Sequence, residues 1–318
     1  MRGLFAEKHV NLSNLPSFRA EHFPYSGPYP WLDRDDALER ISTRLADGEI
    51  TPVQANQCRH WAEDGYIVLE GLIEEPVLDN VWTRYEDAIR AGRIKLDSEP
   101  AAAGDPHPGR YLNPHKKVGA FCSLLKHPQL LDWLKLLTDR PPKPLQTIVS
   151  HKGTQQAVHS DSIHMTTYPL GYLTAAWIAF EDIHPDSGPL VYYPGSHKLP
   201  YVFSREVGIA ENEFRDAGYR AYQQKYEPFI AGSIEKAGLQ PAYFHARKGD
   251  VLIWHANLLH GGSLRRDLQR SRRAVVCHFF VKGAYVYHDL AASRSRQQYM
   301  STCLLQDNIG KLQRWRRK

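Results

Sequence analysis

The sequence predicts a mainly β protein with flanking helices, built around a double-sheet antiparallel barrel of the jelly-roll kind. After about residue 140, short runs of β-branched and aromatic residues are separated by Gly, Pro, Asp and Ser. Strands of this length and spacing, with no crossover helices between them, are typical of such barrels. The expected strands cover residues 145–151, 172–180, 190–193, 243–247, 251–254 and 274–281.

The segment before the barrel predicts helices. Thr51 followed by Pro52 has the pattern of a helix N-cap and a first-turn proline, and Gly65 is placed to end that helix. Residues 66–69 then form a short β-type run. Apolar residues recur at helical spacing over residues 76–89, which predicts a second helix.

These patterns predict a single domain. The first residues are rich in proline and aromatic side chains, which suggests an extended arm draped over the body. A polar, helix-like insertion interrupts the strands, and such an insertion is a natural lid over a site. The domain, residues 1–318, is expected to consist of an N-terminal arm at 1–50, a mainly helical part at 51–140, a barrel core at 141–285 with its insertion at about 203–235, and a C-terminal tail at 286–318.

Composition argues against several classes of protein. The formal charge is only +5, whereas a nucleic-acid-binding protein would show a larger and more organised basic excess. The four cysteines lie far apart, without metal or dithiol spacing, which suits a reducing interior. No stretch has the length of an apolar membrane span or the pattern of a secretory signal. We therefore expect a cytoplasmic protein without nucleic-acid or membrane partners, and its oligomeric state stays open.

The strongest signal for chemistry is His159-Ser160-Asp161, followed about a hundred residues later by His260. Two imidazoles and one carboxylate on one face of a metal leave three coordination positions open, so iron(II) can bind a chelating co-substrate and dioxygen together. Residues two apart in a strand share a face, so His159 and Asp161 at a strand end would point the same way. His260 must then come from a neighbouring strand.

Two arginines, Arg272 and Arg273, follow His260 at the start of the last expected strand. A hairpin turn after His260 would return one of them to the mouth of the barrel. A guanidinium there can pair bidentately with the distal carboxylate of a dicarboxylate. His278 shares strand parity with Arg272, so it is expected to lie beside the site.

Together these motifs resemble the phytanoyl-CoA dioxygenase family over roughly residues 51–281. The resemblance implies a double-stranded β-helix, the cupin-like form of the jelly roll, and an enzyme that uses Fe(II), 2-oxoglutarate as co-substrate and O2. The matching segments, in order, are 61–72 (WAEDGYIVLEGL), 159–161 (HSD), 177–181 (WIAFE), 188–197 (GPLVYYPGSH), 249–255 (GDVLIWH), 260–263 (HGGS) and 272–279 (RRAVVCHF).

The resemblance also implies roles for individual residues when it is carried over by position. The three metal ligands would form the catalytic centre, and three further side chains would contact 2-oxoglutarate. The implied ligands are His159, Asp161 and His260, and the implied 2-oxoglutarate contacts are Arg272, Trp177 and Ser263.

Two features of the sequence bear on these roles. An extra glycine, Gly262, precedes Ser263 and displaces the following arginine by one residue, so Arg273 stays a competitor for the role of Arg272. Relatives that halogenate replace the carboxylate ligand with a small residue, whereas Asp161 is present here. Hydroxylation is therefore favoured over halogenation.

The expected function is hydroxylation of an aliphatic C–H bond of a small organic molecule, with release of succinate and CO2. Desaturation, cyclisation or epimerisation by the same iron chemistry stays open, as does a non-catalytic cupin-like ligand-binding protein. His164 and Gln156 are candidates for substrate contacts at the mouth of the barrel. The sequence contains neither a nucleotide phosphate loop nor a Gly-x-Ser-x-Gly motif, so nucleotide binding and serine hydrolysis are not expected.

Overall fold

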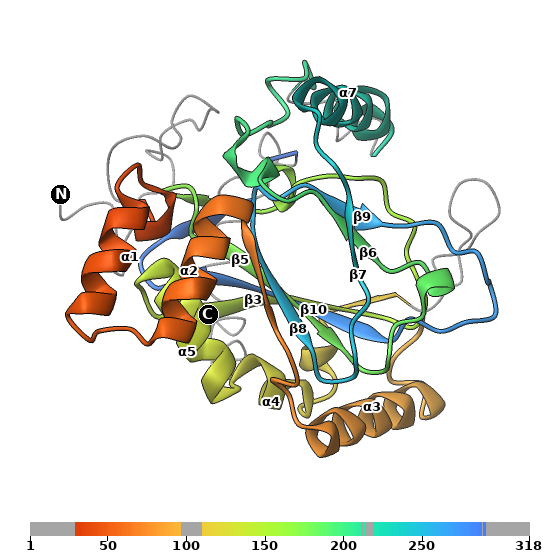
Figure 1. Cartoon of the computed structure of the whole chain (residues 1–318). Helices are drawn as coiled ribbons and strands as arrows, with labels where there is room; N and C mark the ends of the chain where they lie inside the picture. The colour runs from red at the N-terminus through yellow and green to blue at the C-terminus, as the bar shows by residue number, and fades with distance from the viewer. Residues whose placement is uncertain (1–28, 97–109, 211–212, 214–218, 288, 291–318) are drawn as a thin grey trace, which may run out of the picture.

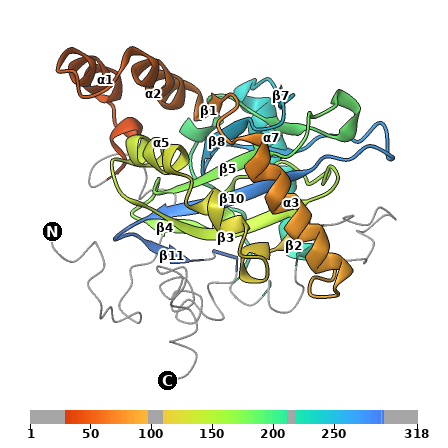
Figure 2. The ribbon, with the colours of Figure 1, turned by 90° about the horizontal axis from the view of Figure 1, so that it is seen from below.

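The barrel predicted from the strand pattern is present as antiparallel sheets around a common interior. The computed structural model describes residues 29–96, 110–210, 213, 219–287 and 289–290. The smaller sheet is β7-β6-β9 (Figure 1). The larger sheet has the strand order β1-β8-β5-β10-β3-β2, and β11 pairs with β4 (Figure 2). The strands are β1 (Tyr66–Leu69), β2 (Tyr111–Leu112), β3 (Pro142–Ser150), β4 (Thr166–Tyr168), β5 (Leu173–Ala179), β6 (Leu190–Tyr192), β7 (Ala242–Phe244), β8 (Val251–His255), β9 (His260–Gly262), β10 (Ala274–Val281) and β11 (Tyr285–Tyr287).

Helices cover the outer face of the larger sheet. In Figure 2, α3 and α5 lie across this sheet, and α1 and α2 lie near its β1 edge. The last helix, α7, lies away from them, beyond the smaller sheet (Figure 1). The helices are α1 (Ala37–Ala46), α2 (Pro52–Asp64), α3 (Glu75–Arg90), α4 (Phe121–Leu125), α5 (Pro128–Thr138) and α7 (Glu227–Ala237).

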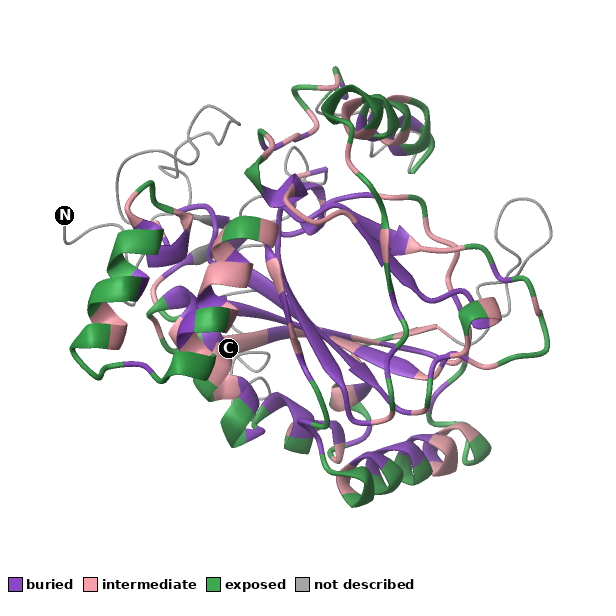
Figure 3. Ribbon diagram, viewed as in Figure 1, coloured by how far each residue is buried: buried purple, intermediate pink, exposed green. Residues whose placement is uncertain are grey.

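The larger sheet buries both of its faces, which explains why its strands are almost wholly apolar. On β10, Val275, Cys277 and Phe279 pack in one hydrophobic cluster with the helices. Trp177 of β5 and Trp254 of β8 belong to a separate cluster inside the barrel. Figure 3 shows these strands largely buried, while the helices expose their outer sides. The helical layer therefore fixes one face of the sheet and leaves the other to line a site.

The helix expected after Thr51 is confirmed as α2. Thr51 Oγ1 accepts the backbone N–H of Gln54 at 3.2 Å, and Gln54 Oε1 accepts the backbone N–H of Thr51 at 2.9 Å, so the pair forms a capping box. Gly65 ends the helix in the left-handed region, with φ of 82°. The expected strands are confirmed as β1, β3, β5, β6, β7, β8 and β10, with small differences at their ends.

The N-terminal arm differs from expectation. Residues 37–46, expected within the extended arm at 1–50, form α1, because Ala37 and Ile41 bury one side of this segment in the core. The rest of the arm up to residue 28 and nearly all of the expected tail at 286–318 lie outside the described residues. The assignment of 1–318 to a single domain stays a prediction.

Irregular and short elements account for the other differences. In the expected insertion at about 203–235, the described helical structure is a π turn, Tyr222–Tyr226, that leads directly into α7. The strands β2, β4, β9 and β11 were not expected, because two or three residues are too few to show a period. Within the described residues, no helix combines the length and apolar character needed to cross a bilayer.

Gly65 offers a test of this packing, with Gly48 as a matched control. Both have positive φ, but a Cβ on Gly65 would overlap the buried imidazole of His197, whereas a Cβ on Gly48 meets nothing within 4 Å. We expect Gly48→Ala to lower the free energy of unfolding by about 1–2 kcal/mol through the left-handed backbone alone. Gly65→Ala should cost roughly a further 1–3 kcal/mol through overpacking. Urea denaturation measures both, and equal losses would contradict the predicted clash.

Candidate metal centre

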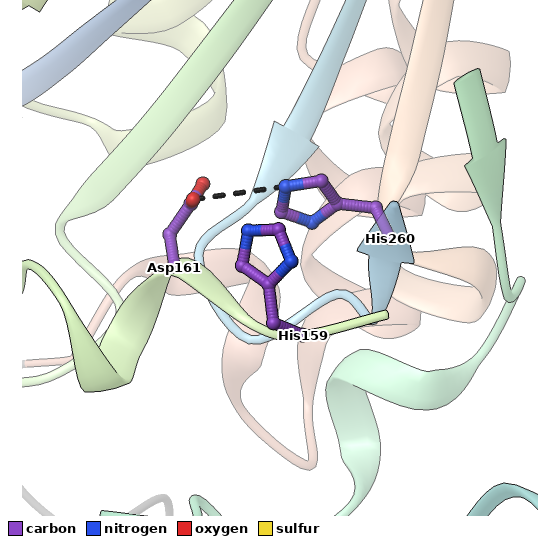
Figure 4. Close-up of side chains that lie close together, drawn as sticks. All are labelled: His159, Asp161 and His260. Carbon is purple, nitrogen blue, oxygen red and sulfur yellow. Dashed lines mark ion pairs between the residues drawn. The ribbon is translucent and has the colours of Figure 1, made fainter. Parts of the chain in front are cut away.

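The three candidate ligands converge through a backbone bridge. His159 pairs with His260 at the start of β9, and each N–H donates to the other residue's carbonyl at 2.9 Å. Asp161 was expected on the same strand as His159, but it begins a 3-10 helical turn, Asp161–Ile163. The three side chains nevertheless point to one place (Figure 4). One nitrogen or oxygen atom of each lies within 4.8 Å of the other two.

Two glycines let β9 approach the segment opposite. A Cβ on Gly261 would lie 2.7 Å from the Gln156 carbonyl oxygen, and a Cβ on Gly262 would lie 2.6 Å from Thr154 Oγ1. Both distances are too short for a carbon atom at these positions, so the close approach requires glycine. The extra glycine noted in the sequence thus lies where two ligand-bearing segments meet.

Backbone carbonyls orient both imidazoles. His159 Nδ1 lies 2.8 Å from the Ala157 carbonyl oxygen, and His260 Nδ1 lies 3.0 Å from that of Leu258. A carbonyl can only accept, so each Nδ1 carries a proton and each Nε2 is the nitrogen left to bind a metal. Burial and the nearby His260 lower the pKa of His159 to about 3, so this imidazole is neutral.

Asp161 is held as a buried carboxylate. Trp254 Nε1 donates to its Oδ2 at 2.9 Å, and His278 Nε2 lies 3.5 Å from the same atom. His260 Nε2 lies 3.6 Å from its Oδ1. Burial alone would raise the pKa of Asp161, but the imidazoles of His260 and His278 hold it well below its ordinary value. The strand parity of His278 had predicted its place beside the site, whereas the role of Trp254 was missed.

A cavity of about 1030 Å³ opens onto these side chains. Its lining includes Trp177 and Trp254 of the larger sheet and Leu190 of the smaller sheet, so it lies inside the barrel. Two imidazoles and one carboxylate, with open space on one side, form the donor set that suits Fe(II) in oxygenases. The residues present therefore fit an iron site.

Arg272 lies in the same cavity as a buried cation. It is 3% exposed, and its Nη1 donates to the Gly188 carbonyl at 3.1 Å while Nη2 lies 3.5 Å from Ser150 Oγ. Among the described residues, its Nε has no hydrogen-bond partner and no carboxylate pairs with it. Burial, with the charges of Arg110 and Arg265, lowers the pKa of Arg272 to about 10, so it remains charged. Burial of a cation without a counter-ion is unfavourable, so an anionic ligand would stabilise Arg272.

Arg273, the competitor, has a different environment. Its Nε lies 3.6 Å from Glu181 and its guanidinium 5.2 Å from the Trp82 ring, outside the barrel interior. Trp177 does line the cavity, with its ring 5.8 Å from the guanidinium carbon of Arg272. The geometry thus separates the two arginines, which the sequence alone left open.

Of the remaining candidate site residues, two line the cavity and one does not. His164 and Gln156 line the cavity, and Gln156 Nε2 lies 3.2 Å from His159 Nε2. Ser263 is absent from the lining, and its Oγ donates to the Pro189 carbonyl at 2.7 Å. Its contact with 2-oxoglutarate stays a prediction that this hydrogen bond does not support.

Sequence reasoning placed the insertion over the site but did not identify which of its residues line the cavity. The helical insertion contributes four lining side chains, among them the buried Tyr222, whose hydroxyl has no hydrogen-bond partner among the described residues. The insertion had been recognised from its composition, but no periodicity indicated which of its residues face inward. The lining residues from it are Tyr219, Tyr222, Gln223 and Glu227.

Comparison with known sequences gives a consistent picture. The family model described as phytanoyl-CoA dioxygenase (PhyH) matches residues 61–274. The peroxisomal phytanoyl-CoA dioxygenase of Mus musculus is 22% identical over 247 residues, which is 70% of this chain and 67% of that protein. Phytanoyl-CoA dioxygenase domain-containing protein 1 of Mus musculus is 31% identical over 186 residues, or 56% of this chain and 58% of that protein.

Solved structures share the fold at low identity. The α-ketoglutarate-dependent carbocyclase SnoK from nogalamycin biosynthesis has a TM-score of 0.59 and 17% identity, covering 80% of this chain and 93% of that chain. EctD from S. alaskensis, crystallised with 2-oxoglutarate and 5-hydroxyectoine, has a TM-score of 0.59 and 16% identity, covering 79% and 83%. These likenesses confirm the cupin-like jelly roll.

The barrel and its His-Asp-His cluster, taken with these relatives, define a non-haem iron dioxygenase. The His-Asp-His donor set suits Fe(II). Among the neighbours in fold, SnoN was crystallised with Fe3+ and α-ketoglutarate, and EctD with 2-oxoglutarate. The resemblance read from the sequence motifs is therefore confirmed. The chain belongs to the phytanoyl-CoA dioxygenase family.

Trp254→Phe tests how the carboxylate of Asp161 is held. The change removes the indole donor that orients this carboxylate, so we expect Fe(II) to bind about 10-fold more weakly in an anaerobic titration. Trp61→Phe is the matched control, because Trp61 is equally buried, lies in the helix-side core and donates no hydrogen bond through its Nε1 to any residue that the structure describes. Equal iron affinities for the two variants would contradict the orienting role of Trp254.

Proposed function

We propose that the chain hydroxylates an aliphatic C–H bond of a small organic molecule, with 2-oxoglutarate and O2 converted to succinate and CO2. His159, Asp161 and His260 would hold Fe(II), and Arg272 would hold the distal carboxylate of 2-oxoglutarate. The observation that supports this most is the pairing, in one cavity, of a three-residue donor set with a buried arginine that has no carboxylate partner among the described residues.

The bound iron supplies the oxidising power that no side chain can provide. The protein's own residues contribute by orienting the metal ligands and by excluding water. The carbonyls of Ala157 and Leu258 hold the imidazoles with Nε2 toward Asp161, so the donor set is formed before a metal arrives. The apolar lining from Trp177, Leu190 and Val276 keeps water away from the reacting carbon.

Arg272 is suited to a dicarboxylate by its shape as well as its charge. A planar guanidinium can pair with a carboxylate through two parallel hydrogen bonds. Two of its nitrogens contact Gly188 and Ser150, which fixes the plane, while the face of Trp177 lies nearby. Nε has no hydrogen-bond partner among the described residues, and the distal carboxylate of 2-oxoglutarate would provide one.

The remainder of the cavity supports a substrate that bears oxygen acceptors. Its wall presents the amides of Gln156 and Gln223, the imidazole of His164 and the hydroxyl of Tyr222. A buried hydroxyl without a partner is costly, and a substrate oxygen would satisfy it. We therefore propose Tyr222, with His164 and Gln156, as substrate contacts.

The other outcomes of iron chemistry use the same residues. SnoK is described as a carbocyclase and SnoN as an epimerase, so neighbours in fold differ in reaction. Hydroxylation is proposed because it needs no feature beyond the donor set, and product analysis distinguishes the alternatives. A cytoplasmic location stays a prediction, and mammalian relatives are named peroxisomal.

Arg272→Ala tests the co-substrate site, with Arg273→Ala as its neighbour control. Fe(II) and 2-oxoglutarate together give a weak visible charge-transfer band under anaerobic conditions, and its growth reports binding. Loss of a bidentate charged pair should weaken 2-oxoglutarate binding roughly 100-fold for Arg272→Ala. Arg273→Ala should leave binding within about 2-fold, since Arg273 pairs with Glu181 outside the cavity. If only Arg273→Ala lost 2-oxoglutarate binding, the co-substrate site would have to be assigned to Arg273.

Tyr222→Phe tests the substrate contact once screening by succinate release has identified a substrate. Removal of one hydroxyl should raise the KM for that substrate about 5- to 10-fold while 2-oxoglutarate affinity stays unchanged. Tyr243→Phe is the control, because Tyr243 lies exposed on β7 away from the cavity. An unchanged KM in Tyr222→Phe would remove Tyr222 from the substrate site.

A further inference from the structure

We infer that Tyr226 is a positioning residue for the metal centre, through which the helical insertion and the metal site stabilise each other. Tyr226 ends the π turn, and its phenolic oxygen accepts the backbone N–H of Ser160 at 3.1 Å. The same oxygen lies 3.2 Å from Ser160 Oγ. Ser160 is the residue between His159 and Asp161, so this inference rests on the proposed function of those two ligands.

The contact between Tyr226 and Ser160 lies in a fully buried setting. Tyr226 is 0% exposed and Ser160 is 1% exposed, so water cannot replace either partner. Without the phenol, the Ser160 N–H would be a buried donor with no acceptor, which is strongly unfavourable. The peptide that joins the two proposed ligands is therefore fixed by a side chain from 66 residues further along the chain.

Apolar packing extends this contact to the second ligand segment. Tyr222, Tyr226 and Ile230 form one buried cluster with Ile163 and Leu259. Ile163 ends the 3-10 turn that Asp161 begins, and Leu259 directly precedes His260. The insertion thus packs against both segments that bear the proposed ligands.

An aromatic series provides a further connection. The rings of Tyr222 and Tyr226 stack, with centroids 5.0 Å apart and planes 20° apart. The Tyr222 ring lies 5.1 Å from His164, whose ring lies 5.6 Å from that of His159. Displacement of the π turn would therefore disturb the ligand loop at several points. Such π turns recur at functional sites.

Thermodynamic linkage makes the coupling between docking of the insertion and metal binding reciprocal. If docking of the insertion improves the metal affinity by some factor, metal binding must stabilise the docked insertion by the same factor. The wall that contains Tyr222 and Glu227 is then held most firmly when the metal is bound. Assembly of the substrate side of the cavity would thus depend on metal.

Metal affinity provides the first measurement. Fe(II) is titrated anaerobically into the full chain for wild type, Tyr226→Phe and the control Tyr85→Phe. The control also removes a buried hydroxyl, but one that lies among the helices and has no hydrogen-bond partner in the described part of the chain. We expect Tyr226→Phe to bind Fe(II) about 10-fold more weakly and to give a shifted charge-transfer band with 2-oxoglutarate. Tyr85→Phe should match wild type. Thermal unfolding in a chelator checks that each variant folds, and Ser160→Ala, which removes one of the two contacts, replaces Tyr226→Phe if that variant folds poorly.

Hydrogen exchange tests the reciprocal effect. In wild type, Fe(II) should slow amide exchange in peptides covering residues 222–237 about tenfold, the factor that linkage requires. This protection should disappear in Tyr226→Phe and in Asp161→Ala. If the wild-type protein does not bind Fe(II), the proposed metal site is wrong, and so is the coupling inferred from it. If wild type binds Fe(II) but Tyr226→Phe shows the same affinity and the same protection, the metal site stands and the coupling through Tyr226 is overturned.

Discussion

The backbone bridge between His159 and His260 is the contact on which the rest of the site depends. It joins a loop after β3 to the first residue of β9, two segments about a hundred residues apart in the chain. The bridge forms only because Gly261 and Gly262 allow the backbones to approach without a Cβ between them. Once the bridge exists, nearby carbonyls fix both imidazoles, and Asp161 needs only one turn of 3-10 helix to complete the cluster.

Two buried charges show why this barrel needs ligands. Asp161 is ionised and Arg272 is charged, yet they are not paired with each other, and burial of an unpaired ion is expensive. Asp161 is partly stabilised by Trp254 and by the neighbouring imidazoles. Arg272 has only neutral contacts among the described residues. A cation beside Asp161 and an anion beside Arg272 would neutralise both charges, and Fe(II) and 2-oxoglutarate would do so at the sites proposed for them.

Much of the fold was predictable because its signals are local. Thr51 and Gly65 mark the ends of α2 through capping and backbone conformation, and the strands of the larger sheet are apolar because both of their faces are buried. The donor set was predictable from spacing and from family resemblance. The role of Trp254 was not, because it depends on β8 lying beside β5 with its inner face toward the cavity. That Arg272 rather than Arg273 faces the cavity likewise depends on which residue turns inward before β10.

The division between sheets also indicates where specificity lies. The larger sheet is fixed by helices on its outer face, so its inner residues have little freedom to vary without disturbing the core. The insertion has no such constraint on the side that lines the cavity, and it supplies Tyr222, Gln223 and Glu227. Neighbours in fold share the barrel while their described reactions differ. Because the donor set must be held by the rigid frame, differences in substrate are expected to arise from this wall, and the contact of Tyr226 with Ser160 ties the wall to the metal loop.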